Sequence, residues 1–133
     1  MCRAFLPGMM ERGDGDVLTI ASVTGKRPLP LRTPHAASKT ALRELTATLP
    51  HEVGTAGVWV NTLSPGPVAG PRMERNFAPE AGRTGGTVHD AEKEFVSCAA
   101  LGRMVTEHEV ADAALAILTM RGLAGADIDL SGG

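Results

Sequence analysis

Val17-Leu18-Thr19-Ile20-Ala21 is a short apolar run, rich in β-branched residues and bounded by turn residues. A run of this kind predicts a buried strand, which we place from Asp16 to Ala21. A helix start follows at Thr33-Pro34, because threonine can cap a helix and proline fits its first position. We expect that helix to run to about Val53, with a kink or an early end at Pro50, because the proline ring clashes with the carbonyl four residues before it.

Strands and helices alternate along the rest of the chain as well. The expected elements are a helix end at residues 1–12, a strand from Val58 to Leu63 that Ser64-Pro65-Gly66-Pro67 breaks, short helical pieces within residues 71–96, a helix from Glu107 to Arg121 and a strand from Asp127 to Leu130. Between the short helical pieces, we expect Gly82 to Gly86 to form a surface loop. The alternation predicts an α/β fold with a parallel sheet.

Composition limits the classes of function. The 133 residues allow one domain, and the net charge of −2 offers no basic surface for nucleic acid. No apolar run reaches the roughly 20 residues of a membrane span, so we expect no membrane association. Cys2 and Cys98 do not form a disulfide pattern, which favours a cytoplasmic protein. The histidines His51, His89 and His108 have no metal-ligand spacing with them, so no metal site is expected.

Ser22 directly follows the first strand, and His35-Ala36-Ala37-Ser38-Lys39 begins thirteen positions later. This spacing resembles the Ser…Tyr-x-x-x-Lys signature of the short-chain dehydrogenase/reductases. In that family a tyrosine stands where this chain has His35, and the chain contains no tyrosine. The further segments that resemble the family's motifs, in the same order, are Ile20–Gly25 at the strand end, Val60–Val68 with its Val-Asn…Pro-Gly pattern, Leu101–Met104 followed by Glu109-Val110-Ala111, and Gly125 with Gly132-Gly133.

The resemblance implies a partial Rossmann-type parallel sheet, the C-terminal half of a doubly wound fold. Residues 1–133 would be a single truncated domain that lacks the family's N-terminal dinucleotide-binding βαβ unit. The glycine-rich phosphate turn of that unit has no counterpart here, because Gly82 to Gly86 follows no strand.

The resemblance also assigns roles to individual residues, with NAD or NADP as the cofactor and a small carbonyl or alcohol compound as the substrate. Ser22 would hydrogen-bond the substrate oxygen, and Lys39 would bind the nicotinamide ribose. Pro65, Gly66 and Val68 would line the nicotinamide carboxamide with backbone groups. His35 would hold the acid/base position on the same helix face as Lys39.

Two outcomes for His35 follow from its chemistry. Histidine can exchange protons near neutral pH, so the residue type permits acid/base catalysis. Imidazole is shorter than phenol, however, and a misplacement of ~1 Å can cost ~10²-fold in rate. The two outcomes are therefore a histidine that acts as the acid/base and a site that is inactive.

Three functions remain open from the sequence. The first is NAD(P)-dependent carbonyl/alcohol interconversion by ancestry, with the isolated chain expected to be inactive. The second is a non-catalytic interaction module that associates, as a homo- or hetero-oligomer, with chains of the same family through its helices. The third is a gene fragment with no selected function.

Overall fold

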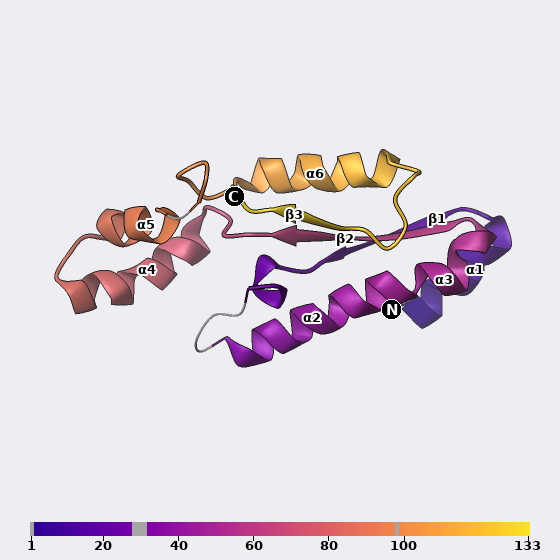
Figure 1. Cartoon of the computed structure of the whole chain (residues 1–133), viewed down its shortest axis with the longest axis horizontal. Coiled ribbons are helices and arrows are strands. Elements are labelled where there is room, and N and C mark those ends of the chain that lie inside the picture. Colours follow the sequence, from indigo (N-terminus) through magenta and orange to yellow (C-terminus); the bar gives the residue numbers. More distant parts are fainter. Residues whose placement is uncertain (1, 28–31, 98) are drawn as a thin grey trace.

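The strands form where β-branched and apolar residues cluster, as β1 (Gly15–Ile20), β2 (Val58–Pro65) and β3 (Asp127–Leu130). The structure, a computed structural model, describes residues 2–27, 32–97 and 99–133. The helices are α1 (Cys2–Arg12), α2 (Thr33–Thr48), α3 (Pro50–Val53), α4 (Pro71–Thr84), α5 (Val88–Val96) and α6 (Glu107–Thr119), with short 3-10 turns η1 (Val23–Gly25) and η2 (Gly54–Ala56). The predicted α/β fold is confirmed (Figure 1).

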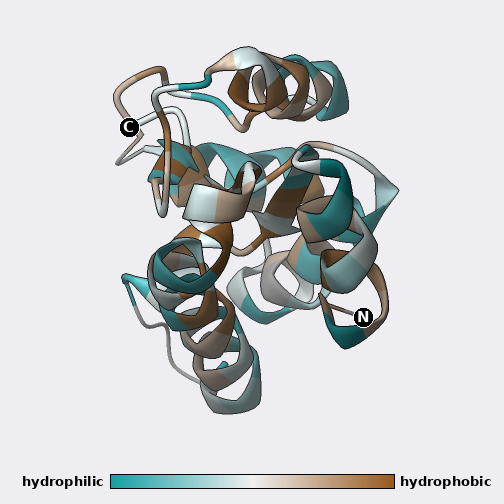
Figure 2. Cartoon of the chain, turned by 90° about the vertical axis from the view of Figure 1, so that its right-hand side faces the viewer, coloured by the Kyte–Doolittle hydropathy of each residue, from teal (hydrophilic) through white to brown (hydrophobic). Residues whose placement is uncertain are grey.

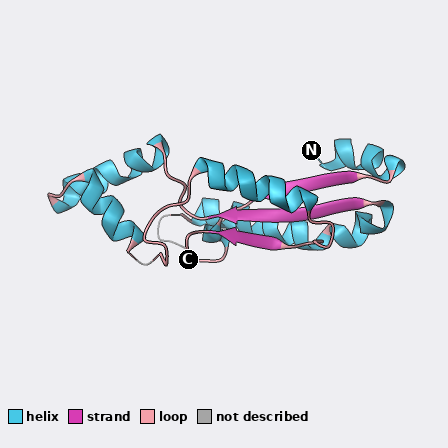
Figure 3. Ribbon diagram, turned by 90° about the horizontal axis from the view of Figure 1, so that it is seen from above, coloured by secondary structure: helices cyan, strands magenta, loops and turns pink. Residues whose placement is uncertain are grey.

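The three strands form one parallel sheet in the order β1-β2-β3. Gly15 pairs with Val58 at the start of β1, and Thr62 pairs with Asp127 at the start of β3. Helix α6 lies over one face of the sheet, while α2 covers the other face (Figures 1 and 3). Because both faces are covered, nearly every residue of β2 is buried.

The core lies between the sheet and the helices at the end of the molecule where α1 and α3 meet it. Leu49, Val53, Val58 and Val60 are buried together there, and residues of α1 pack against them. Figure 2 shows apolar residues concentrated on the strands between the helices.

The start of α2 differs by one residue from the expectation. Arg32 holds the N-cap position and makes no side-chain cap bond, so Thr33 is the first helical residue and not the cap. Pro34 is tolerated in this first turn because the N–H groups there have no partner within the helix. The early end expected at Pro50 is confirmed, since α2 stops at Thr48 and Pro50 begins α3.

Strand β2 continues through Ser64 and Pro65, so the break expected after Leu63 is wrong. Thr62 and Gly66 both donate their N–H groups toward the β3 side, to the carbonyls of Ala126 and Leu130. Backbone N–H groups alternate in direction along a strand, so the backbone nitrogen of Pro65 faces β1. Strand β1 ends at Ile20, which pairs with Leu63, so no β1 residue lies opposite Pro65. The missing N–H of the proline therefore costs no ladder hydrogen bond.

Helix α4 runs through Pro79 and Gly82 to Thr84. The surface loop expected from Gly82 to Gly86 is therefore confined to Gly85 and Gly86. Gly85 caps the end of the helix with φ 71°. Packing outweighs the low helix propensity of proline and glycine here. Phe77 of α4 is buried and meets Phe95 of α5 edge to face, with ring centroids 5.3 Å apart.

The remaining elements need small corrections. The first strand begins and ends one residue earlier than expected, at Gly15 and Ile20, and α6 ends at Thr119 instead of Arg121. The third strand lies where it was expected. None of the helices within residues 2–27, 32–97 and 99–133 is long and apolar enough to cross a membrane.

Strand β1 pairs with β2 along one edge, and no strand among the described residues covers its other edge. An open strand edge pairs readily with another chain. We expect the 133-residue chain to self-associate, with sedimentation velocity showing larger species as the concentration rises. Ile20, 45% exposed at the end of β1, gives the test: Ile20→Lys should weaken association several-fold, because lysine on an edge strand opposes pairing.

The matched control is Leu115→Lys on α6, which adds the same charge at a residue that is 64% exposed and away from the β1 edge. A chain that stays monomeric at every concentration would contradict the prediction. So would association that only the control variant removes.

Candidate functional site

Ser22 follows β1 after one intervening residue, Ala21, and caps the turn η1. Its backbone is extended, with φ −170°, and its hydroxyl caps the turn. The Ser22 Oγ accepts the N–H of Thr24 at 3.2 Å and donates to the Thr24 hydroxyl at 3.2 Å. The strand end therefore presents a half-buried hydroxyl whose outgoing hydrogen bond is long and exchangeable.

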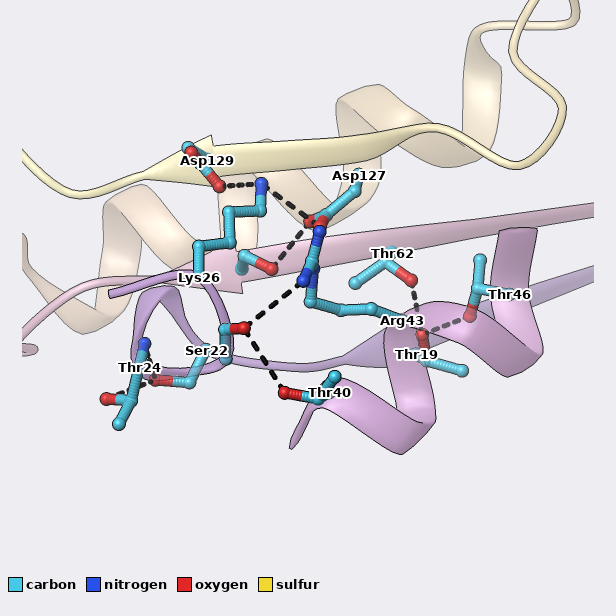
Figure 4. Close-up of polar contacts among 12 residues, drawn as sticks. Thr19, Ser22, Thr24, Lys26, Thr40, Arg43, Thr46, Thr62, Asp127 and Asp129 are labelled. Atoms are coloured by element: carbon cyan, nitrogen blue, oxygen red, sulfur yellow. Dashed lines mark hydrogen bonds and ion pairs between the residues drawn. The ribbon is translucent and has the colours of Figure 1, made fainter. Parts of the chain in front are cut away.

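Helix α2 packs closely on this turn. The carbonyl of Gly25 accepts bonds from the Thr40 hydroxyl and the Arg43 guanidinium, each at 3.2 Å (Figure 4). A side chain at Gly25 would place its Cβ 3.2 Å from the Thr40 backbone nitrogen. Glycine thus permits the approach that fixes the turn bearing Ser22 against the helix.

Lys39 reaches from α2 to the end of β1. Its Nζ donates to the carbonyl of Ile20 at 2.8 Å. His35 lies one turn earlier in the same helix, half-buried, and its carbonyl accepts the Ser38 hydroxyl. Within the described part of the chain, no hydrogen bond joins the side chains of Ser22, His35 and Lys39 to one another. The structure brings Lys39 to the strand end that carries Ser22 and places His35 four residues away on that helix.

The segment after β2 forms the neighbouring wall. Gly66 donates its N–H to Leu130 at 2.8 Å, and a Cβ at Gly66 would lie 2.8 Å from the Cα of Ser131. Glycine is therefore required where this segment crosses the C-terminal residues. Pro65 is buried at the end of the strand just before this crossing.

Val68 presents its main chain to the same region. A parallel bridge to Val105 uses the carbonyl of Pro67 and the N–H of Ala69, at 3.1 and 2.8 Å. The N–H and C=O of Val68 itself have no hydrogen-bonding partner in the described part of the chain. One donor and one acceptor are thus available side by side.

Because β1 and β2 are parallel neighbours, both walls lie at one edge of the sheet, where open α/β folds bind their ligands. One wall carries a hydroxyl, an imidazole and an ammonium group, and the other offers backbone donors and acceptors. This combination can hold a polar planar ring and exchange a proton with an oxygen atom.

A group of charged residues that the sequence did not single out supports this edge (Figure 4). Asp127 of β3 accepts the Ser64 hydroxyl at 2.6 Å, Arg43 Nε at 2.5 Å and Lys26 Nζ at 3.0 Å. Lys26 also pairs with Asp129. The available signal was the pair of aspartates two residues apart in a short strand, which places both on one face of the sheet.

These contacts shift two pKa values. Burial alone would raise the pKa of Asp127, but the hydrogen bonds from Ser64, Arg43 and Lys26 outweigh it and lower that pKa. Burial alone would lower the pKa of Lys26, yet its bonds to Asp129 and Asp127 raise it. Asp127 therefore stays ionised, and the ion cluster is intact at neutral pH.

Asn61, in the Val-Asn…Pro-Gly pattern, has a structural role. Its side chain is buried, donates to the carbonyl of Leu123 at 3.2 Å and accepts the N–H of Ala126 at 3.0 Å. Asn61 thus holds the connection from α6 to β3. Only the second half of the pattern, from Pro65 onward, reaches the candidate site.

The described residues include no group of three or more histidine, cysteine, aspartate or glutamate side chains that could hold a metal ion. His51, His89 and His108 are exposed. Cys98 lies outside the described residues.

Comparison with known proteins points to one family. The family model described as short chain dehydrogenase matches residues 1–81. A short-chain dehydrogenase/reductase of Armillaria gallica is 38% identical over 104 residues, covering 77% of this chain and 38% of that protein.

Solved structures agree. A 3-oxoacyl-[acyl-carrier protein] reductase from Brucella melitensis with bound NAD is 31% identical, with a TM-score of 0.79 over 99% of this chain and 45% of that one. An actinorhodin polyketide ketoreductase with NADPH is 26% identical, with a TM-score of 0.85 over 95% of this chain and 49% of that one. The chain spans less than half the length of these relatives.

Asp127→Asn should destabilise the chain at pH 7 by about 1–3 kcal/mol, because it weakens charged hydrogen bonds to Ser64, Arg43 and Lys26. A carboxylate whose folded-state pKa is lowered contributes stability above its unfolded pKa and loses it as the pH falls through the folded value. The difference in unfolding free energy between the unchanged chain and the Asp127→Asn variant should therefore shrink as the pH falls below about 4. Urea unfolding from pH 2 to pH 7 measures it.

Asp14→Asn is the control, since Asp14 is exposed in the turn before β1 and makes no ion pair with any residue that the structure describes. A difference between the Asp127 variant and the unchanged chain that stays constant across this pH range would refute the assignment.

Proposed function

Because the chain belongs to the short-chain dehydrogenase family, we propose that the edge formed by the ends of β1 and β2 is the catalytic and nicotinamide side of an oxidoreductase site that interconverts carbonyl and alcohol groups. The observation that carries the proposal is the bond from Lys39 Nζ to the carbonyl of Ile20, 2.8 Å long. It joins the helix of the His35–Lys39 pair to the strand end that bears Ser22.

Nicotinamide cofactors are used across the family, and two of the similar structures contain NAD and NADPH. The residues of this chain fit such a group. Among the described residues, the N–H and C=O of Val68 have no partner and match a carboxamide, while Gly66, whose N–H is bonded to Leu130, permits the close crossing of Ser131 beside them. Lys39 would donate to the ribose hydroxyls. The cofactor, when bound, supplies or accepts the hydride.

The proton chemistry falls to side chains of this chain. Ser22 would exchange its long bond to the Thr24 hydroxyl for one to the substrate oxygen. His35 would give a proton to that oxygen in reduction and take it back in oxidation. The Lys39 ammonium would orient the bound ribose and keep the local potential positive.

As an isolated chain, the 133 residues are proposed to be inactive, as a single domain without the phosphate-binding βαβ unit. The sequence contains no Gly-x-x-x-Gly-x-Gly turn. Dinucleotide affinity depends largely on such a turn at a helix N-terminus. We also propose that the protein works in the reducing environment of the cytoplasm.

Association with another chain of the family is the second candidate function. Phe5 on α1 and Leu45 on α2 are 61% and 44% exposed, so both helices present apolar side chains to a partner. The open edge of β1 offers a second contact of the same kind.

The cofactor part of the proposal gives a binding prediction. The remaining contacts reach only the nicotinamide end, so we expect no saturable binding of NAD(H) or NADP(H) below millimolar concentration. Isothermal titration calorimetry on the chain measures this. Micromolar affinity for either dinucleotide would show that a phosphate site exists elsewhere in the chain.

The His35 part gives an activity prediction. His35→Tyr in this chain should produce no carbonyl reduction with either cofactor. Fused to the N-terminal half of a full-length relative, the same variant should reduce carbonyl compounds, and the fusion that keeps His35 should be slower by at least ~10²-fold, the scale of a general acid.

Steady-state turnover of the two fusions is the measurement, with Ser22→Ala in each as the inactive control. Equal rates for the His35 and tyrosine fusions would establish histidine as a working proton donor. Inactivity of both fusions in a folded state would overturn the proposed function.

A further inference from the structure

A cavity of about 230 Å³ lies beside the candidate site, between the turn η1, the segment after β2 and helix α5. Two of its lining residues adjoin site residues in sequence, Val23 next to Ser22 and Pro67 next to Gly66. The cavity is therefore bordered by the two chain segments that carry Ser22 and Gly66.

The wall of the cavity is mainly apolar. Phe95, Val96, Ala99 and Met104 line it together with Val23 and Pro67. Phe95 is 45% exposed although its ring meets that of Phe77 edge to face, so a large part of the side chain is free to contact a ligand. The volume lies below the roughly 300–1,000 Å³ of pockets for drug-sized ligands, which favours a short chain.

Two arginines stand at the cavity, and they differ in their partners. Arg103 is held by Glu109 through two hydrogen bonds of 2.6 and 2.9 Å and also donates to the carbonyl of Met104. These bonds from Arg103, with the N–H of Thr106, lower the pKa of Glu109 to about 2, so the pair persists at neutral pH. Arg103 is therefore already neutralised.

Arg27 is exposed, and its backbone N–H donates to the carbonyl of Val23 at 2.8 Å. Its guanidinium has no hydrogen bond or ion pair in the described part of the chain. The two aspartates of β3 are engaged by other cations, Asp129 by Lys26 and Asp127 by Lys26 and Arg43. The cavity thus combines apolar walls with one guanidinium that forms no ion pair within residues 2–27, 32–97 and 99–133, and Ser131 and Gly133 complete its lining.

We propose that this cavity binds a short aliphatic carboxylate, with its chain against Phe95 and Met104 and its carboxylate on Arg27. A guanidinium matches a carboxylate with two parallel hydrogen bonds, which a neutral alcohol of the same length does not offer. The inference rests on the proposed function, for which it names the substrate class: small oxo- or hydroxy-acids whose reacting carbon faces Ser22.

The test measures binding of hexanoate and of 1-hexanol to the 133-residue chain by equilibrium dialysis without cofactor. Dialysis registers binding in any oligomeric state. Hexanoate should bind saturably and at least ~10-fold more tightly than 1-hexanol, the scale of a hydrogen bond to a charged group. Arg27→Gln should remove that preference, and Arg27→Lys should keep part of it.

Arg12→Gln is the matched control, because Arg12 is exposed at the end of α1 and takes no part in the cavity. It makes the same change of charge and should leave hexanoate affinity within ~2-fold. Circular dichroism confirms that each variant is folded.

The proposal is overturned if hexanoate and 1-hexanol bind equally, if Arg27→Gln leaves the preference intact, or if inorganic phosphate displaces hexanoate as strongly as a second carboxylate does. An active tyrosine fusion that shows no hexanoate binding would leave the proposed function standing without this substrate class. Hexanoate binding together with an inactive tyrosine fusion would leave the carboxylate site standing and overturn the proposed function.

Discussion

Strand β2 is hydrogen-bonded on both edges and covered on both faces, and the other elements are arranged around it. Parallel strands need such cover because their side chains are apolar on both faces. The cover comes from α2 on one side and α6 on the other. The parallel order also brings the C-terminal ends of β1 and β2 together, at the side of the sheet where the candidate site lies. The parallel arrangement therefore accounts both for the cover that β2 needs and for the position of the site.

The charged cluster at Asp127 connects that edge to the rest of the sheet. A partly buried carboxylate is costly unless its oxygens are satisfied, and here it binds groups from β2, from α2 and from the segment after η1. Arg43 also bonds Gly25 in the Ser22 turn. The turn, the helix of Lys39 and the last strand are thus held in one arrangement, although they are far apart in the sequence.

Local patterns gave most of the fold, because periodicity and turn chemistry are properties of neighbouring residues. The strand at Val17 and the end of α2 at Pro50 followed from them. Pro65 was misjudged because its effect depends on where the neighbouring strand stops, and Gly82 because burial of Phe77 outweighs local propensity. Ser22 and Lys39 were put forward by the resemblance to the family's signature, and the structure brings Lys39 to the strand end that carries Ser22. The pair Asp127 and Asp129 in one short strand was a local signal. The partners of Asp127, and the main-chain groups of Val68 that stay unbonded among the described residues, depend on contacts between segments that are distant in the sequence.

The register of the sheet has a consequence for how the molecule assembles. Gly15 meets Val58, and Thr62 meets Asp127, so each strand pairing closes a long loop of chain before it gains any hydrogen bond. Loop closure of this kind slows folding, whereas a capping box such as that of Thr106 and Glu109 involves only the first turn of its helix. Helix α6 can form early and locally, while the sheet completes late, and during synthesis β2 must wait for its last neighbour until residue 127 has left the ribosome.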